Sequence, residues 1–273
     1  MNGQKIDNVL VVCDKLNPKA AAYLKELEPL LESATIGFTE KASAALMEFV
    51  DMIVVLGGDG TMLKTVHAYD FKSIFLGINC GHVGFLMNDS NPGGAADRIL
   101  NGEFEVHRFP LLEIDIGPQQ CFLAMNDVYF KSIAGPACKI NIKVNGGEIA
   151  ERVVGDGVVI STAIGSTGYF VPAHGSAINP KIPAIGLAPL HVHTPIQFLP
   201  MILPLSSEIE LTLLSPKEEV KGFYDGIELP YFQKIKIRES GQIVRLVFWK
   251  GESFTARLIN KIMRVQEGKN ADN

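Results

Sequence analysis

The residues with the clearest chemical potential lie in one short turn, Gly57-Gly58-Asp59-Gly60-Thr61. The turn follows Asp51–Leu56, an apolar, β-branched run typical of a strand buried on both faces. It precedes Met62–Tyr69, which is predicted to be a helix. A strand, a glycine turn and a helix together present backbone N–H groups and a helix N-terminus to an anion, usually a phosphate.

Asp59 places a carboxylate in the middle of this turn, where it would repel a phosphate. The combination is explained if Asp59 handles a metal ion or orients a hydroxyl while the glycine amides hold phosphate. The alternative is a tight structural turn in which Asp59 caps the helix. The turn alone leaves both interpretations open.

A second candidate run is Gly155–Tyr169, in which the predicted strand Val153–Thr162 leads into glycines and hydroxyl-bearing residues. Asp156 is suited to accept a hydrogen bond from a sugar hydroxyl, and Tyr169 offers a ring. The hydroxyl groups that could bind ribose or phosphate belong to Ser161, Thr162, Ser166 and Thr167. A glycine-rich loop without ligand contacts is the alternative.

Two further features carry polar groups. Asn126-Asp127 interrupts the apolar run Phe122–Phe130, which indicates either a β-bulge or a ligand contact. Asn126 is suited to pair with the edge of an adenine ring. His174 follows the second run and is either a donor to a phosphate or an ordinary surface histidine.

Around the first turn, short strands alternate with helices, which predicts a parallel sheet with ligands at the carboxyl ends of its strands. We therefore expect an α/β, Rossmann-like domain over residues 1–101. Its other predicted strands are Asn8–Cys13 and Ser73–Asn79. A helix is predicted to begin at Asn17-Pro18, and two further helices are predicted over Glu40–Phe49 and Pro92–Leu100.

From residue 102 onward, helical periodicity is replaced by short strand-like runs. They predict an all-β domain over residues 102–254, so that the overall class is α+β. A final helix, Thr255–Met263 within residues 255–273, could pack back on the first domain. The remaining predicted strands are Leu111–Ile116, Lys139–Val144, Glu208–Leu214, Gln233–Arg238 and Val244–Trp249, with a hairpin turn at Asn145-Gly146.

Composition narrows the class of protein. The chain has 273 residues, 47% hydrophobic and 20% charged, as expected of a globular protein that buries a sizeable core. A net charge of −5 argues against a nucleic-acid-binding surface. Four widely spaced cysteines predict reduced thiols in a cytoplasmic protein. The first residues do not read as a signal peptide, and the proline-containing run Ile182–Leu205 does not read as a membrane span.

These motifs resemble those of the NAD kinase family, over most of the chain and in the same order. The turn GGDG alone is shared with phosphofructokinases and lipid kinases, but its combination with the later motifs is specific. The resemblance rests on GGDGT (Gly57–Thr61), GINCGHVGFL (Gly77–Leu86), HRFPLLEI (His107–Ile114), Asn126-Asp127, Gly155–Tyr169 and Tyr224-Asp225-Gly226.

The resemblance implies phosphoryl transfer from ATP to the adenosine-ribose 2′-hydroxyl of NAD, which gives NADP. It implies that Asp59 is the catalytic proton acceptor, and the phosphate loop is expected at Gly57, Gly58, Gly60 and Thr61. The NAD-binding residues that it implies are Asp59, Gly60, Lys64, Asn126, Asp127, Asp156, Thr167, Gly168, Tyr169 and Pro172. A divalent metal, Mg²⁺, is expected without assigned protein ligands, and the family resemblance suggests a homodimer or homotetramer.

The sequence departs from the family pattern at several positions. Asp127 stands where glutamate is usual, so its carboxylate must come closer to a ligand or act through water. The other departures are Ala163, Gly168, His174 and Ile227. A lipid or sugar kinase with the same turn, or a non-catalytic dinucleotide-binding protein, are the competing hypotheses.

Overall fold

The computed structural model describes residues 6, 8–14, 16–31, 35–39, 48–81, 84–118, 120–133, 137–194, 198–214, 220–251 and 253–266. The chain divides into two compact units, Met1–Arg108 with Val244–Asn273 (unit 1) and Phe109–Ile243 (unit 2). The boundaries expected from sequence, after residues 101 and 254, differ by several residues. The chain crosses between the units within two long strands, β5 (Phe104–Asp115) and β16 (Lys234–Trp249), and a strand gives no composition signal at a crossing.

Unit 1 is built on a parallel sheet with the strand order β2-β1-β3-β4-β16. Its strands are β1 (Val9–Cys13), β2 (Thr35–Thr39), β3 (Met52–Gly57), β4 (Ile74–Asn79) and the end of β16. β1 and β3 are buried at every residue, as their unbroken apolar runs predict. The predicted α/β domain with a parallel sheet is confirmed.

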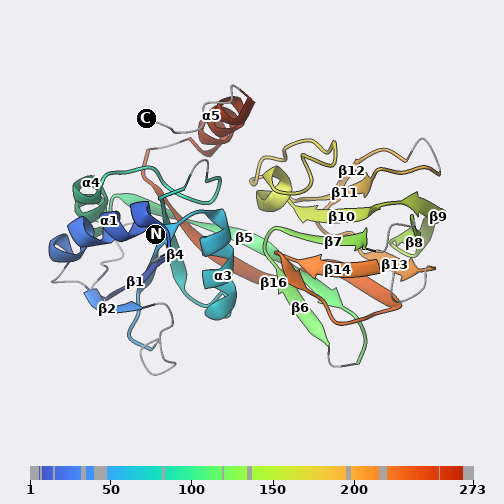
Figure 1. The fold of residues 1–273 in the computed structure, drawn as a ribbon, viewed down its shortest axis with the longest axis horizontal. Helices are drawn as coiled ribbons and strands as arrows, with labels where there is room; N and C mark the ends of the chain where they lie inside the picture. Colours follow the sequence, from blue (N-terminus) through green and yellow to red (C-terminus); the bar gives the residue numbers. More distant parts are fainter. Residues whose placement is uncertain are drawn as a thin grey trace. The chain divides into compact units, whose positions relative to one another are not determined.

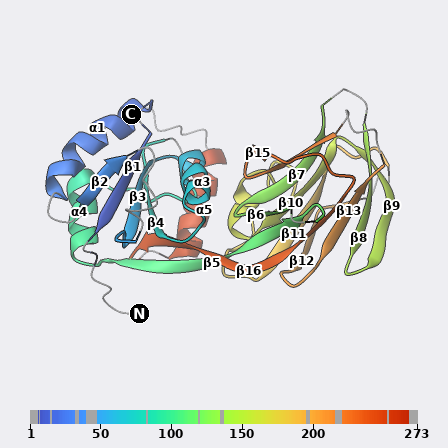
Figure 2. The same ribbon diagram turned by 90° about the horizontal axis from the view of Figure 1, so that it is seen from below.

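Helices cover both faces of this sheet. Figure 2 shows α1 (Pro18–Leu27) and α4 (Pro92–Leu100) on one face and α3 (Asp59–Ala68) on the other. The Asn17 side chain caps α1 by accepting from the backbone N–H groups of Lys19 and Ala20. A single 3₁₀ turn, η1 (Glu28–Leu30), follows α1, and α5 (Phe254–Gln266) is the last helix. The predicted helix Glu40–Phe49 falls almost entirely outside the described residues, and its last two residues form a turn.

The glycine turn lies at the carboxyl edge of this sheet. β3 and β4 pair in register up to Gly57 opposite Asn79. The Cys80 backbone N–H donates to the Gly57 carbonyl at 2.8 Å, and the Asn17 amide donates to the Cys80 carbonyl at 3.0 Å. These contacts fix the end of β3, from which the candidate site begins.

Unit 2 consists of antiparallel strands in two sheets (Figure 1). One sheet has the order β12-β11-β10-β7-β14-β15, and the other contains β16-β13-β8-β9 together with β5 and β6. A single apolar cluster joins inward-facing residues of both sheets, among them Ile114, Phe130, Ile142 and Ile160. The strands are β6 (Cys121–Ala124), β7 (Asp127–Ser132), β8 (Cys138–Val144), β9 (Gly147–Gly155), β10 (Gly157–Thr162), β11 (Ala184–Leu190), β12 (Met201–Pro204), β13 (Ile209–Leu213), β14 (Val220–Tyr224) and β15 (Ile227–Glu228).

The outer face of the six-stranded sheet is covered by residues 163–178, which begin with the 3₁₀ turn η2 (Ile164–Thr167). Phe170 is fully buried there against Val159 and Ala188. A Cβ at Gly175 or Gly186 would lie only 2.4 Å or 2.6 Å from the Phe170 ring, so both glycines are needed for this packing. Because one face of β10 packs on the main core and the other on this segment, every residue of β10 is buried.

Several strand predictions were wrong in detail. The run Val153–Thr162 is divided at Asp156 into β9 and β10, because the chain passes there from one sheet to the other: β9 pairs with β8, and β10 pairs with β7 and β11. The runs Gln233–Arg238 and Val244–Trp249 are parts of one strand, β16, in which Gly241 has a positive φ of 71°. β11 was not predicted, because Pro189 in its interior argues against a strand.

No helix among the described residues is long and apolar enough to cross a membrane.

Candidate functional site

The helix α3 begins at Asp59, three residues earlier than Met62, the first residue of the predicted helix. Its N-cap is Gly58, in an extended conformation (φ −116°, ψ −173°), and the Gly58 carbonyl accepts from the N–H groups of Thr61 and Met62, both at 3.0 Å. Asp59 is therefore the first helical residue and not the cap. The purely structural alternative, an aspartate N-cap, is wrong.

Two backbone amides hold the Asp59 carboxylate. Phe85 N–H donates to Oδ2 at 2.8 Å, and Leu86 N–H donates to Oδ1 at 2.9 Å. A Cβ at Gly84 would lie 3.2 Å from Oδ1 and 2.7 Å from the Met87 side chain, so the approach of this segment requires glycine. Bonds to a charged acceptor are strong and directional, and each oxygen keeps further acceptor capacity. The GINCGHVGFL segment thus orients the carboxylate.

The glycines of the turn serve two purposes. A Cβ at Gly57 would lie 2.5 Å from Thr61 Oγ1, so Gly57 is needed where β3 passes the first turn of α3. Among the described residues beyond the adjoining chain, none has an atom within 4 Å of a Cβ position at Gly58 or Gly60, so these two residues form the open side of the turn. Lys64 is exposed on α3, but five residues turn a helix by roughly 140° from Asp59, onto a different face.

In unit 2, Asp225 organises the turn that carries Asn126. The Asp225 carboxylate accepts from the backbone N–H groups of Met125 and Asn126, both at 2.7 Å, and of Asp127 at 3.2 Å. Asp225 N–H donates in return to the Asp127 carbonyl at 3.0 Å. The backbone of Asp225 has a φ of 47°, a conformation that aspartate tolerates better than most residues. The strand expected over Phe122–Phe130 is broken at this turn, between β6 and β7.

The turn leaves one buried acceptor without a partner. Asn126 Oδ1 is buried and makes no hydrogen bond with any described residue. A Cβ at Gly165 would lie 2.1 Å from the Asn126 carbonyl, so η2 reaches the turn only because residue 165 is glycine. Buried polar atoms without partners are rare, so this acceptor is a candidate contact for a ligand that donates a hydrogen bond.

The hydroxyl groups that precede Thr167 belong to the frame of the site. Thr162 Oγ1 donates to the Met125 carbonyl at 2.6 Å, and Ser161 Oγ donates to the Asn126 carbonyl at 3.1 Å. Ser166 Oγ donates to the Ala163 carbonyl at 2.8 Å. All three side chains are buried, so the expectation that they bind ribose or phosphate is wrong, whereas Thr167 is only half-buried.

Asp127 is a buried carboxyl group in a site of low polarity. Burial, first of all, and the negative charge of Asp225 together raise its pKa from 3.8 to about 7, although the Tyr169 N–H, 3.5 Å from Oδ2, acts in the opposite direction. A Cβ at Gly168 would lie 3.2 Å from the same oxygen. Asn126, Asp127, Gly168 and Tyr169 thus lie together, and Asp127 can donate or accept a hydrogen bond near neutral pH.

We predict that Asp127 makes the protein less stable as the pH rises from about 4 to about 7. In this range the folded protein keeps a proton on Asp127 that the unfolded chain has lost, so deprotonation favours unfolding. In urea unfolding experiments, the free energy of unfolding of the wild type, relative to that of Asp127→Asn, should decrease as the pH rises. Parallel stability curves would contradict the prediction.

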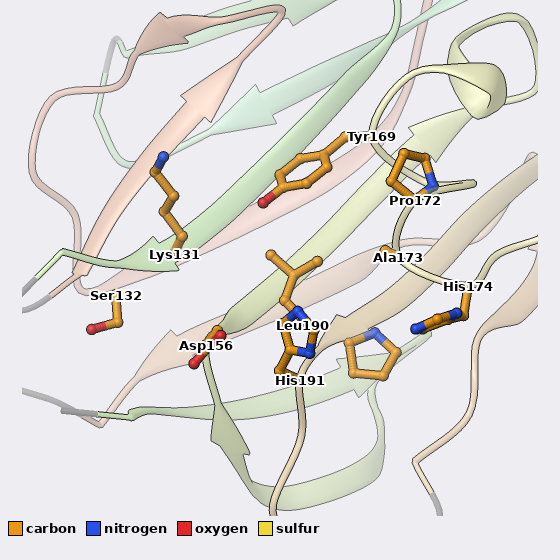
Figure 3. A pocket seen from close by; sticks show the side chains of 10 residues that line it. Lys131, Ser132, Asp156, Tyr169, Pro172, Ala173, His174, Leu190 and His191 are labelled. Carbon is orange, nitrogen blue, oxygen red and sulfur yellow. The ribbon is translucent and has the colours of Figure 1, made fainter. Parts of the chain in front are cut away.

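A pocket of 210 Å³ in unit 2 brings together three other predicted residues, Asp156, Tyr169 and Pro172 (Figure 3). The Asp156 backbone is fixed between strands, because its N–H donates to the Leu190 carbonyl and its carbonyl accepts from Ser132 N–H, both at 2.8 Å. The pocket also contains residues to which sequence reasoning gave no role there: Lys131, Ser132, Ala173, Pro189, Leu190 and His191. His174, considered as a phosphate donor, lines it as well.

Models of the N-terminal and C-terminal domains of ATP-NAD kinases match residues 10–104 and 125–248. The chain belongs to the ATP-NAD kinase family. The NAD kinase of Brucella melitensis biotype 1 is 32% identical over 85% of this chain and 92% of its own length. The NAD kinase of Pyrococcus abyssi is 33% identical over 84% of this chain and 83% of its own.

Solved ATP-NAD kinase structures share the fold. A crystal structure of an NAD kinase from Archaeoglobus fulgidus in complex with ATP has a TM-score of 0.77 at 26% identity, over 94% of this chain and 98% of that chain. Yeast NADH kinase complexed with NADH has a TM-score of 0.81 over 99% of this chain and 89% of that chain, at 20% identity. The N-terminal match contains Asp59, and the C-terminal match contains Asn126, Asp156 and Asp225.

Proposed function

We infer that this protein is an NAD kinase, which transfers the γ-phosphoryl group of ATP to the adenosine-ribose 2′-hydroxyl of NAD and so makes NADP. Family membership and the similarity to NAD kinases over most of the chain support this function. The observation that carries it within the molecule is the Asp59 carboxylate, held by two backbone amides at the start of α3 between two open glycines.

Asp59 acts chiefly by aligning the 2′-hydroxyl group of the acceptor. A ribose hydroxyl is a very weak acid, and an aspartate of ordinary pKa ~3.9 is a poor base for it. In a loose phosphoryl-transfer transition state, however, the nucleophile loses its proton late, so that a strong base is not required. The amides of Phe85 and Leu86 fix the direction in which the carboxylate accepts this proton.

The phosphate groups are placed by the turn. The open sides of Gly58 and Gly60, at a helix N-terminus, favour contact between backbone N–H groups and phosphate oxygens. Thr61 adds a hydroxyl in the same helical turn. Because Lys64 lies on another face of α3, we propose that it stabilises phosphate charge from a distance.

The dinucleotide is held by unit 2. We propose that the Asn126 amide pairs with the adenine edge, since its buried Oδ1 lacks a donor that an amino group would supply. Asp127, Gly168 and Tyr169 contact the same ligand beside Asn126, and Thr167 adds its hydroxyl. Asp156 accepts a hydrogen bond from a ribose hydroxyl in the pocket that Tyr169 and Pro172 also line.

A divalent metal, Mg²⁺, is proposed as a cofactor that arrives with ATP. Mg²⁺ is commonly held by one or two carboxylates together with substrate phosphates, which needs no protein cage. The described residues contain no group of three His, Cys, Asp or Glu side chains that could form such a cage. When bound, the metal would neutralise the charge of the triphosphate.

We expect NADP formation to require added Mg²⁺. The protein is incubated with NAD, ATP and Mg²⁺, and NADP is detected with an NADP-specific dehydrogenase. Excess EDTA should lower the rate at least ~10²-fold because the triphosphate charge is then unscreened, and excess Mg²⁺ should restore it. A rate that EDTA leaves unchanged would remove the metal from the mechanism, and an absence of NADP under all conditions would refute the function itself.

The expected cytoplasmic location and homo-oligomeric state remain proposals. All four cysteines are free thiols and three are buried, which suits a reducing compartment. The edge strand β12 exposes Ile202 by 53%, and the preceding Leu199 is exposed by 70%, which offers an apolar edge to a second copy.

A further inference from the structure

The pocket that contains Asp156 holds two histidines in an unusual backbone conformation. His174 has a φ of 63° and His191 a φ of 42°. Six non-glycine residues in the described part of the chain have positive φ, and these two line the same pocket. A left-handed conformation destabilises residues that have a Cβ, and such strain gathers where a side chain has a function.

The two backbones are held in place by their surroundings. His174 N–H donates to the Val171 carbonyl at 3.0 Å, in the loop that the buried Phe170 anchors. His191 follows β11, and a Cβ at Gly155 would lie 2.9 Å from its carbonyl, so the end of β9 leaves no room for another path. The structure therefore presents both imidazoles at the pocket.

No hydrogen bond or ion pair joins the side chain of His174 or His191 to another described residue. Both side chains are exposed, and Figure 3 shows the His174 ring directed toward the side of the pocket where His191 and Asp156 lie. Their N–H groups are free to bind a ligand.

The other polar groups define the ligand. Lys131 lines the pocket with its amine 5.9 Å and 5.4 Å from the ring centres of Tyr129 and Phe223, and it adds positive charge. The Asp156 carboxylate and the Tyr169 hydroxyl are the remaining titratable groups. Imidazole and amine donors suit a phosphate, while a carboxylate suits a hydroxyl; together they match a phosphorylated sugar. The volume of 210 Å³ is below the ~300–1,000 Å³ of sites for whole drug-sized ligands, so the pocket accommodates part of a dinucleotide.

We propose that His174 and His191 together bind a phosphate of the dinucleotide in this pocket, beside the ribose whose hydroxyl donates to Asp156. The proposal rests on the dinucleotide-binding function and adds two residues to which the family resemblance gave no role. The phosphate belongs either to the pyrophosphate of NAD or to the 2′-phosphate of NADP.

The test uses the double variant His174→Gly with His191→Asn. Glycine and asparagine both tolerate positive φ, so the thermal midpoint should stay equal or rise while the imidazoles are lost. Asp70→Gly is the matched control, because Asp70 is an exposed residue of unit 1 with a φ of 51°. It should leave every binding constant unchanged.

Binding is measured by calorimetry with NAD, NADP and two matched pairs, AMP with adenosine and nicotinamide mononucleotide with nicotinamide riboside. If the histidines contact the pyrophosphate, the double variant should raise the Kd of NAD and NADP equally, about tenfold, together with that of AMP or of nicotinamide mononucleotide. If they contact the 2′-phosphate, it should raise the Kd of NADP alone about tenfold. The nucleosides should be unchanged in both cases. Constants within twofold of the wild type for every phosphorylated ligand, or an equal loss for nucleosides and nucleotides, would overturn the proposal. Because binding is measured without turnover, the result stands whether or not NADP is formed.

Discussion

Replacement of Asp59 by asparagine is expected to lower kcat about 10³-fold and to change the Kd for NAD by less than threefold. Asparagine occupies the same space, but it has only one oxygen that can accept a hydrogen bond from the hydroxyl group, and it cannot take up the proton of that group. One of the two N–H donors, Phe85 or Leu86, then faces an NH₂ group instead of an oxygen. Steady-state kinetics and calorimetry with NAD measure the two effects separately.

The asparagine variant also loses a charge-assisted hydrogen bond, so its fold must be checked. Thermal unfolding should show a modest decrease, since one such bond contributes ~1.5–3 kcal/mol. Asp70→Asn, an exposed aspartate of the same unit, is the control and should keep the wild-type kcat. If Asp59→Asn retained more than a tenth of the wild-type turnover, Asp59 would not have the catalytic role assigned to it.

Truncation of Asp225 to alanine is expected to destabilise the protein by about 3 kcal/mol and to weaken NAD binding about 100-fold. The change removes the acceptor for three backbone N–H groups, those of Met125, Asn126 and Asp127. The turn then loses the geometry that directs the Asn126 amide toward a ligand. It also removes the negative charge that helps to raise the pKa of Asp127.

Two variants separate positioning from simple loss of stability. Asp225→Asn keeps an oxygen acceptor and tolerates the positive φ, so it should recover part of both losses. Asp115→Ala removes an aspartate that accepts from one backbone N–H, that of Gly117, elsewhere in unit 2, and should leave NAD binding intact. Urea unfolding measures the stability of each variant, and calorimetry measures its affinity for NAD. Wild-type NAD affinity in a folded Asp225→Ala protein would show that the Asn126 turn does not need this carboxylate.

The sequence supports the fold class well, because the features that define it are local. The buried runs of β1 and β3 and the cap at Asn17 can each be recognised within a few residues. The change of sheet at Asp156 was missed, and the interruption at Asn126 was expected only as a bulge or a ligand contact, because both strand ends depend on pairing with distant parts of the chain. Local pattern contains no information about such contacts.

The residues of the candidate site, too, could be predicted where their signal was local and were missed where it was not. Asp59, Asn126 and Asp156 were found because their residue types are out of place in apolar runs. The position of Asp225 beside the Asn126 turn, about a hundred residues away along the chain, had no local signal, although the family motif contained it. Conversely, Ser161, Thr162 and Ser166 were proposed as ligand contacts because hydroxyl groups look alike in sequence, whether they bind a ligand or a backbone carbonyl.

The segment 163–178 belongs to neither sheet and is attached through Phe170, whose ring Gly175 and Gly186 enclose. The side chains of this segment therefore pack on the face of the sheet opposite to the core that both sheets share. Ala163, Gly168 and His174, three of the departures from the family pattern, all fall within this segment. We therefore expect substitutions in this segment to be tolerated by the fold, and to be able to change dinucleotide preference, as long as Phe170, Gly175 and Gly186 are kept.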